Sequence, residues 1–167
     1  MQRLILLRHG KADSVSALGG DLERGLTDRG RRDAALMGRV LAEAGFSPDL
    51  VLVSSARRAC ETWEEAAAAF PGAKVEFSRG LYLASRDHLA HTVEATGDTA
   101  DCLMIVGHNP GLHEMAIACA GPNAIDDDEG VLDSFPTAAA AVFARTSSGG
   151  WRLERMMVPR DHGGGIL

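Results

Sequence analysis

Cysteine is scarce in this sequence of 167 residues: there are three, Cys60, Cys102 and Cys119. Their number is odd and none belongs to a CxxC or CxxH pair, so neither a disulfide framework nor a zinc site is indicated. Isolated cysteines of this kind are typical of small buried side chains in a reducing compartment.

Long apolar runs are also absent. The first run, residues 4–7, meets a charge at Arg8 and is too short for a secretion signal with its cleavage site. No other stretch approaches the roughly 20 apolar residues that a membrane-spanning helix needs. We therefore expect a cytoplasmic protein that does not bind membranes.

The charge balance argues against a nucleic-acid partner. The chain has 17 basic and 23 acidic side chains and a net charge of -6, whereas nucleic-acid binders collect Lys and Arg. Walker A, GxSxG and HExxH motifs are missing, which removes the NTPase, serine hydrolase and zincin interpretations that depend on them. Apolar residues make up 46% and charged residues 24%, as in ordinary globular proteins.

Short apolar runs alternate with helical patterns along the chain. The runs, which predict buried strands, are residues 4–7, 50–53, 102–106 and 138–143. Thr27 and Ser85 are predicted helix caps, and Pro110 suits the first turn of another helix. The alternation predicts an α/β three-layer sandwich with a largely parallel central sheet flanked by helices. We expect one domain over residues 1–162 and a flexible glycine-containing tail at 163–167.

Three of the predicted strands are followed by side chains that can bind anions. Arg8 and His9 follow the first, Arg58 lies just after the second, and His108 follows the third. Because ligands of such sheets bind beyond the carboxyl ends of the strands, we expect these side chains to meet at one edge.

This set of side chains suits phosphate chemistry. A phosphoryl group carries up to two negative charges, and the planar fork of arginine complements its oxygens. A histidine between arginines tends to stay neutral and can act as a nucleophile while a carbonyl fixes its other nitrogen. The sequence predicts His9 as nucleophile and Arg8 and Arg58 as clamp. We expect a second, protonated histidine, His108, to face the phosphoryl oxygens and add charge stabilisation.

Linked motifs around these residues resemble the histidine phosphatase superfamily, with its phosphoglycerate mutase-like fold, and within it the SixA-like phosphohistidine phosphatases. The segments that carry the resemblance are residues 6–13, 24–30, 54–63 and 106–111, with 135–139 and 159–161 as later matches. The resemblance extends from residue 4 to residue 161, nearly the whole chain.

The resemblance implies a covalent phosphohistidine intermediate on His9, with Arg8, Arg58 and His108 around the phosphate. It selects Arg58 over Arg57, because the family's phosphate ligand is the arginine that precedes an alanine. Arg24 and Asn109 are expected at the edge of the pocket, and no metal or cofactor is implied. The expected partner is a phosphorylated small molecule or a phosphohistidine-bearing protein domain.

One feature of many superfamily members is missing. They carry a Glu or Asp that protonates the leaving oxygen, but residues 81–85, in the corresponding place, contain no carboxylate. Asp13 or Glu23 could take the place of this acid, although the positions of both are more typical of solvated charges in a loop. A departing imidazole belongs to a group with a pKa near ~6.5, whereas an alkoxide resembles water at ~15.7 and needs an acid. The sequence therefore favours phosphohistidine or another activated phosphate.

Two alternatives remain open at this point: a small-molecule phosphomonoesterase of the same superfamily, and a non-catalytic phosphate-binding module. A mutase is disfavoured by chain length and by the missing acidic signature. The acidic run Asp126 to Glu129 could bind a cation or repel an acidic partner, but its pattern is more typical of a solvated loop.

Overall fold

The computed structural model describes residues 1–122 and 133–167, so the acidic run Asp126 to Glu129 lies outside the described residues. Six strands form one sheet in the order β3-β2-β4-β1-β5-β6. They are β1 Arg3–Arg8, β2 Leu50–Ser54, β3 Lys74–Ser78, β4 Cys102–Gly107, β5 Ala140–Arg145 and β6 Trp151–Met157. The first four strands pair in parallel, whereas β5 pairs antiparallel with both β1 and β6.

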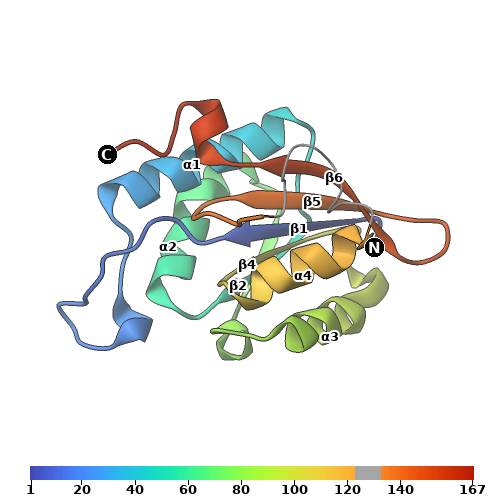
Figure 1. The fold of residues 1–167 in the computed structure, drawn as a ribbon, viewed down its shortest axis with the longest axis horizontal. Coiled ribbons are helices and arrows are strands. Elements are labelled where there is room, and N and C mark those ends of the chain that lie inside the picture. Colours follow the sequence, from blue (N-terminus) through green and yellow to red (C-terminus); the bar gives the residue numbers. More distant parts are fainter. Residues whose placement is uncertain (123–132) are drawn as a thin grey trace.

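Helices cover both faces of this sheet (Figure 1). On one face α1 (Asp28–Glu43) and α2 (Arg57–Ala66) enclose a core that includes Met37 and Trp63. On the other face α3 (Arg86–Thr96) and α4 (Gly111–Ala120) enclose a second core that includes Leu89 and Leu112. The predicted three-layer sandwich with a largely parallel sheet is confirmed. None of the described helices is long and apolar enough to cross a membrane.

The ends of the helices follow local side-chain chemistry. The Thr27 and Ser85 hydroxyls accept hydrogen bonds from the amides of Gly30 and His88, as expected for N-caps. Pro110, predicted in the first turn of a helix, is the N-cap residue of α4 instead. Short 3-10 turns are η1 Asp21–Glu23, η2 Ala67–Ala69, η3 Arg79–Leu81, η4 Gly97–Thr99 and η6 Pro159–His162.

Two strands, β3 and β6, were not predicted from the sequence. Both lie at the edges of the sheet, where a strand does not need a continuous apolar run. In β3, Lys74 and Glu76 alternate with Val75 and Phe77, and all four side chains are exposed. The predicted fourth strand begins two residues late, at Ala140, because Ala138 adopts a positive φ of 60°.

The C-terminal tail lies beside α1. The Gly164 amide donates to the carbonyl of Pro159, and the Gly165 amide donates to the Asp33 carboxylate at 2.9 Å. These bonds place residues 163–165 against the domain. The predicted flexibility of this segment stays a prediction.

Candidate active site

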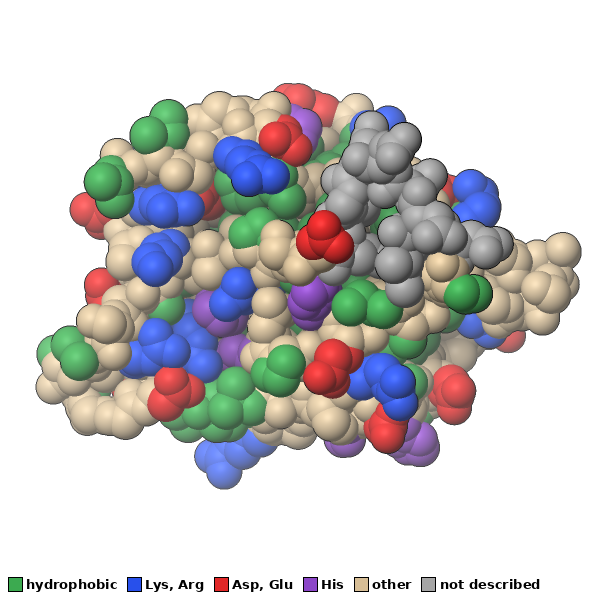
Figure 2. Space-filling model, viewed as in Figure 1, with side chains coloured by type: hydrophobic (Ala, Val, Ile, Leu, Met, Phe, Trp, Pro, Cys, Tyr) green, Lys and Arg blue, Asp and Glu red, His purple; other side chains and the backbone are tan. Residues whose placement is uncertain are grey.

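The ends of three neighbouring strands bring the predicted residues together. Strand β4 lies between β1 and β2, so the segments that follow the three strands share one edge of the sheet. They open into a cavity of about 430 Å³. All six predicted site residues line it: Arg8, His9, Arg24, Arg58, His108 and Asn109. In Figure 2 a group of histidine and basic side chains, purple and blue, lies left of the centre of the face shown.

The backbone holds the His9 ring in a defined orientation. His9 Nδ1 lies 2.8 Å from the carbonyl oxygen of Gly10. A carbonyl only accepts, so Nδ1 carries the ring hydrogen and Nε2 keeps its lone pair. The Gly10 amide in turn donates to Thr62 Oγ1 on α2 at 2.9 Å. A Cβ at Gly10 would lie 2.6 Å from the Gly30 carbonyl oxygen, so only glycine fits between β1 and α1 here.

The surroundings of His9 keep its imidazole neutral. Burial is the largest cause and lowers the pKa of His9 to about 3, with the charges of His108, Arg58 and Arg8 acting in the same direction. The hydrogen bond to Gly10 opposes this shift but does not cancel it. At neutral pH, Nε2 of His9 therefore carries a free lone pair that can act as a nucleophile.

Two arginines, the half-buried Arg8 and the buried Arg58, lie beside His9, and each donates to a backbone oxygen. Arg8 Nη1 donates to the Phe135 carbonyl at 3.0 Å, and Asn109 Nδ2 donates to the same oxygen at 2.9 Å. Arg58, only 2% exposed, donates to the carbonyl of Asp21 at 2.8 Å and to its carboxylate at 3.0 Å. Burial, followed by the charge of Arg58, lowers the pKa of Arg8.

Three nitrogens of the cavity-lining residues are buried without a hydrogen-bond partner: Arg8 Nε, Arg58 Nε and His108 Nδ1. Buried polar groups in proteins are nearly always paired, and each exception calls for an explanation. The two arginine nitrogens are permanent donors in a positively charged setting. The tetrahedral oxygens of a phosphoryl group would pair with such donors.

His108 packs against His9, with the two ring centroids 5.1 Å apart. Its Nε2 lies 2.7 Å from the hydroxyl of Ser54, at the end of β2. Burial, and next the charge of Arg58, lowers the pKa of His108 to about 4, although Asp21 opposes the shift. The sequence led us to expect a protonated His108. The structure makes it neutral at neutral pH, because the ring is buried among cations.

Asp21 is one of the cavity-lining residues that sequence reasoning missed. It lies in η1 and accepts hydrogen bonds from Tyr82 Oη, from Arg24 Nε at 2.9 Å and from Arg58 Nη2 at 3.0 Å. These bonds, with that of Tyr82 the largest, hold the pKa of Asp21 well below its usual range. The spacing of Asp21 and Arg24, three residues apart in one loop, was the available sequence signal.

The two carboxylates considered from the sequence, Asp13 and Glu23, are not among the described residues that line this cavity. The backbone of Asp13 makes hydrogen bonds here: its carbonyl accepts from Arg24 Nη1 at 2.6 Å, and its amide donates to the Gly25 carbonyl. Among the described residues that line the cavity, Asp21 is the only one with a carboxylate. Its lowered pKa keeps this carboxylate ionised at neutral pH. It therefore has no proton to give to a leaving group at neutral pH.

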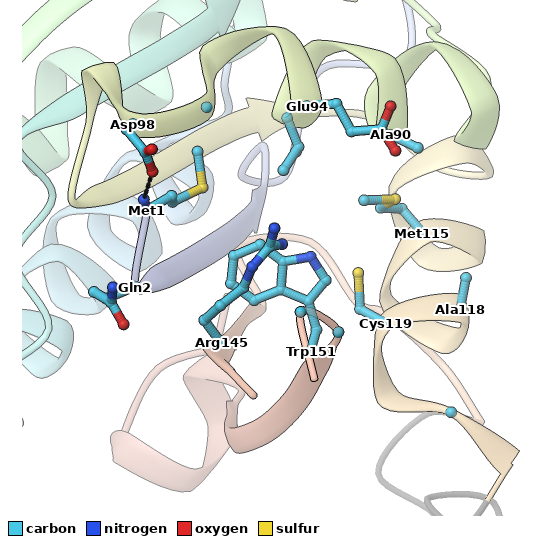
Figure 3. A pocket seen from close by; sticks show the side chains of 15 residues that line it. Met1, Gln2, Ala90, Glu94, Asp98, Met115, Ala118, Cys119, Arg145 and Trp151 are labelled. Atoms are coloured by element: carbon cyan, nitrogen blue, oxygen red, sulfur yellow. Dashed lines mark hydrogen bonds and ion pairs between the residues drawn. The ribbon is translucent and has the colours of Figure 1, made fainter. Parts of the chain in front are cut away.

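A larger cavity of about 780 Å³ lies at the opposite end of β1. Its described lining includes neither His9 nor His108, and neither Arg8 nor Arg58. Figure 3 shows Met1, Cys119, Arg145 and Trp151 among the side chains around it. Arg145 lies over the Trp151 ring at 4.7 Å, and burial raises the pKa of the Cys119 thiol to about 11, so this thiol is unreactive. Within residues 1–122 and 133–167 no group of three or more His, Cys, Asp or Glu side chains could hold a metal ion.

Comparison with known proteins agrees with this geometry. The family model described as "Histidine phosphatase superfamily (branch 1)" matches residues 4–82. An uncharacterised chloroplastic protein of Arabidopsis thaliana is 32% identical over 171 residues, which cover 95% of this chain and 78% of that protein.

Two solved structures with the same fold come from bacteria. A protein of Agrobacterium tumefaciens, assigned as the phosphohistidine phosphatase SixA, is 28% identical with a TM-score of 0.84, over 95% of this chain and 98% of that one. A protein of Nakamurella multipartitia with the same assignment is 26% identical with a TM-score of 0.78, over 95% and 96% of the two chains. With its phosphoglycerate mutase-like fold and its strand-end histidines and arginines, this chain belongs to the histidine phosphatase superfamily.

Proposed function

We propose that this protein hydrolyses phosphohistidine, or another activated phosphate, through a covalent phosphohistidine intermediate on His9. The observation that carries the proposal is the surroundings of His9 Nε2. His9 lines the same cavity as Arg8, Arg58 and His108, and each of these three residues has a buried nitrogen without a hydrogen-bond partner. A nucleophile and a set of phosphate ligands thus share one cavity.

The proposed reaction has two displacements. In the first, Nε2 of His9 forms a bond to phosphorus while the bond to the leaving group breaks, and that electron pair stays on the leaving atom. Arg8 and Arg58 donate charged hydrogen bonds to the phosphoryl oxygens, which stabilises the negative charge on these oxygens in the transition state. In the second, water attacks the same phosphorus, which releases inorganic phosphate and returns the electron pair to Nε2.

The choice of an activated substrate rests on Asp21. A phosphatase for alkyl esters needs a group that protonates the leaving oxygen. Asp21, the only carboxylate among the described residues that line the cavity, is ionised at neutral pH and cannot do this. An imidazole leaves more readily than an alkoxide. The likeness to proteins assigned as phosphohistidine phosphatases supports the same choice.

The proposed partner is a phosphorylated small molecule or a protein domain that carries phosphohistidine. We also propose a cytoplasmic location. The three cysteines are unpaired, which fits a reducing compartment.

The direct test is phosphate release from a phosphohistidine peptide by the purified protein. We expect turnover with excess EDTA present, because arginine and histidine supply the positive charge that a metal would otherwise bring. Vanadate or tungstate should inhibit by occupying the phosphate site. Loss of activity in EDTA with recovery on addition of Mg²⁺ would contradict the metal-free mechanism. Binding of phosphate without hydrolysis of any substrate would favour the non-catalytic module.

Two adjacent arginines provide a matched pair of variants. Arg58→Ala should lower kcat/KM on the order of a hundredfold or more, because a preorganised donor is removed from the developing charge. Arg57→Ala should cost much less, since Arg57 is half exposed and does not line the cavity, and its buried partner Glu61 keeps an ion pair with Arg31. Steady-state kinetics on the same substrate measures both. Equal losses would show that Arg58 is not a phosphate ligand.

A further inference from the structure

The last residue of β2, Ser54, is fully buried and lies next to the second histidine of the site. Strands β2 and β4 are in parallel register, with Val53 beside Val106, so the residues that follow each strand are close. Ser54 Oγ is 2.7 Å from His108 Nε2. The same oxygen accepts a hydrogen bond from the Ala56 amide at 3.3 Å.

The hydrogen of the Ser54 hydroxyl can be placed by elimination. The Ala56 amide is a donor, so it uses a lone pair of Oγ and leaves the hydroxyl hydrogen free. Among the described residues, His108 Nε2 is the one acceptor within hydrogen-bond distance of that hydroxyl. If His108 donated instead, the buried Ser54 hydrogen would have no acceptor, at a cost comparable to a lost hydrogen bond.

We infer that Ser54 donates to His108 Nε2 and so fixes the neutral His108 ring in the tautomer with its hydrogen on Nδ1. His108 lines the cavity, and its Nδ1 is the ring nitrogen that is buried without a hydrogen-bond partner. In this tautomer His108 offers an N–H donor to a phosphoryl oxygen without first binding a proton. Ser54 is thus a positioning residue that acts through His108. The inference rests on the proposed function for the identity of the acceptor.

This arrangement resolves a difficulty of the site. Burial, with the charges of Arg58, Arg8 and Arg24 and against that of Asp21, lowers the pKa of His108 to about 4. The rings of His9 and Tyr82 pack against it. A mechanism that needed an imidazolium at this position would lose activity as the pH rises toward neutrality. A neutral Nδ1–H donor does not depend on pH there. We therefore expect no loss of kcat between pH 6 and pH 8 that could be assigned to His108.

The test compares Ser54→Ala with Ser55→Ala in the full chain. The ¹⁵N chemical shifts of the histidine side chains distinguish the two neutral tautomers, and they should show His108 with hydrogen on Nδ1 in the wild type. Ser54→Ala should move His108 toward the Nε2–H form and lower kcat on the order of tenfold or more, because a histidine held in the wrong tautomer catalyses poorly. Ser54→Thr should restore both. Ser55→Ala should change neither, because Ser55 bonds to the Ser78 carbonyl through its backbone amide, which the substitution keeps.

A double-mutant cycle separates positioning from simple loss of stability. In a His108→Ala background, Ser54→Ala should cause no further loss of kcat. An equal loss with and without His108, or a wild-type spectrum with hydrogen on Nε2, would overturn the inference while leaving the phosphatase mechanism intact. If Ser54→Ala does not fold, the wild-type spectrum decides alone. The tautomer can be measured without turnover, so the failure of hydrolysis in the wild type would count against the proposed function only.

Discussion

Replacing His9 by alanine is expected to abolish hydrolysis, and in the wild type the phosphoryl group should appear on His9 during turnover. Removal of a nucleophile closes the covalent route, and such losses can reach the order of 10⁶-fold. The structure gives a specific reason to choose His9 over His108. His9 Nδ1 is hydrogen-bonded to the Gly10 carbonyl, so Nε2 of the neutral ring carries no hydrogen. In His108, by contrast, Nε2 is hydrogen-bonded to the Ser54 hydroxyl.

The measurement is rapid mixing with a labelled phosphorylated substrate, followed by an alkaline quench that preserves the P–N bond and by mapping of the labelled peptide. His91→Ala, on the exposed side of α3, is a matched control that should keep full activity and full labelling. Label on a residue other than His9 would contradict the mechanism. So would a His9→Ala variant with wild-type kcat.

The central part of the fold could be predicted because buried parallel strands leave continuous apolar runs. β1 and β4, covered on both faces, were identified in this way, and the residues that follow them were correctly expected at one edge. The edge strands β3 and β6 left no such run. Their pairing depends on neighbours distant in sequence, which a single pattern cannot show.

The electrostatics of the site could be predicted only in part. A neutral His9 was expected from the nearby arginines, but burial is the larger cause of its lowered pKa. The same burial makes His108 neutral, contrary to expectation, and burial cannot be seen in a short motif. Asp21 reaches the cavity through the loop between β1 and α1, where its bonds to Tyr82 and Arg58 join residues far apart in the sequence. No motif records such contacts.

The rate of hydrolysis should depend steeply on the leaving group. A positioned acid typically contributes ~10²–10⁴-fold, so its absence should open a gap of about that size between activated and alkyl phosphates. Phosphohistidine and aryl phosphates should be cleaved well and sugar phosphates poorly, as measured by kcat/KM across a panel of substrates. Comparable values for the two classes would mean that an acid is present, and the protein would then be a general phosphomonoesterase with the same His9 mechanism.

Substitution of the loop carboxylates distinguishes an acid from a residue that positions the clamp. Asp13→Asn and Glu23→Gln should barely change cleavage of any substrate, because neither side chain lines the cavity in the described structure. Asp21→Asn should lower kcat/KM for activated and alkyl substrates by the same factor, since the carboxylate orients Arg58 and Arg24 for every substrate. An acid would behave differently: its loss would slow alkyl substrates strongly and leave phosphohistidine nearly unaffected, because only the poor leaving group needs the proton. That selective pattern at Asp21 would show that the carboxylate gains a proton when substrate binds, and the assignment to activated phosphates would fall.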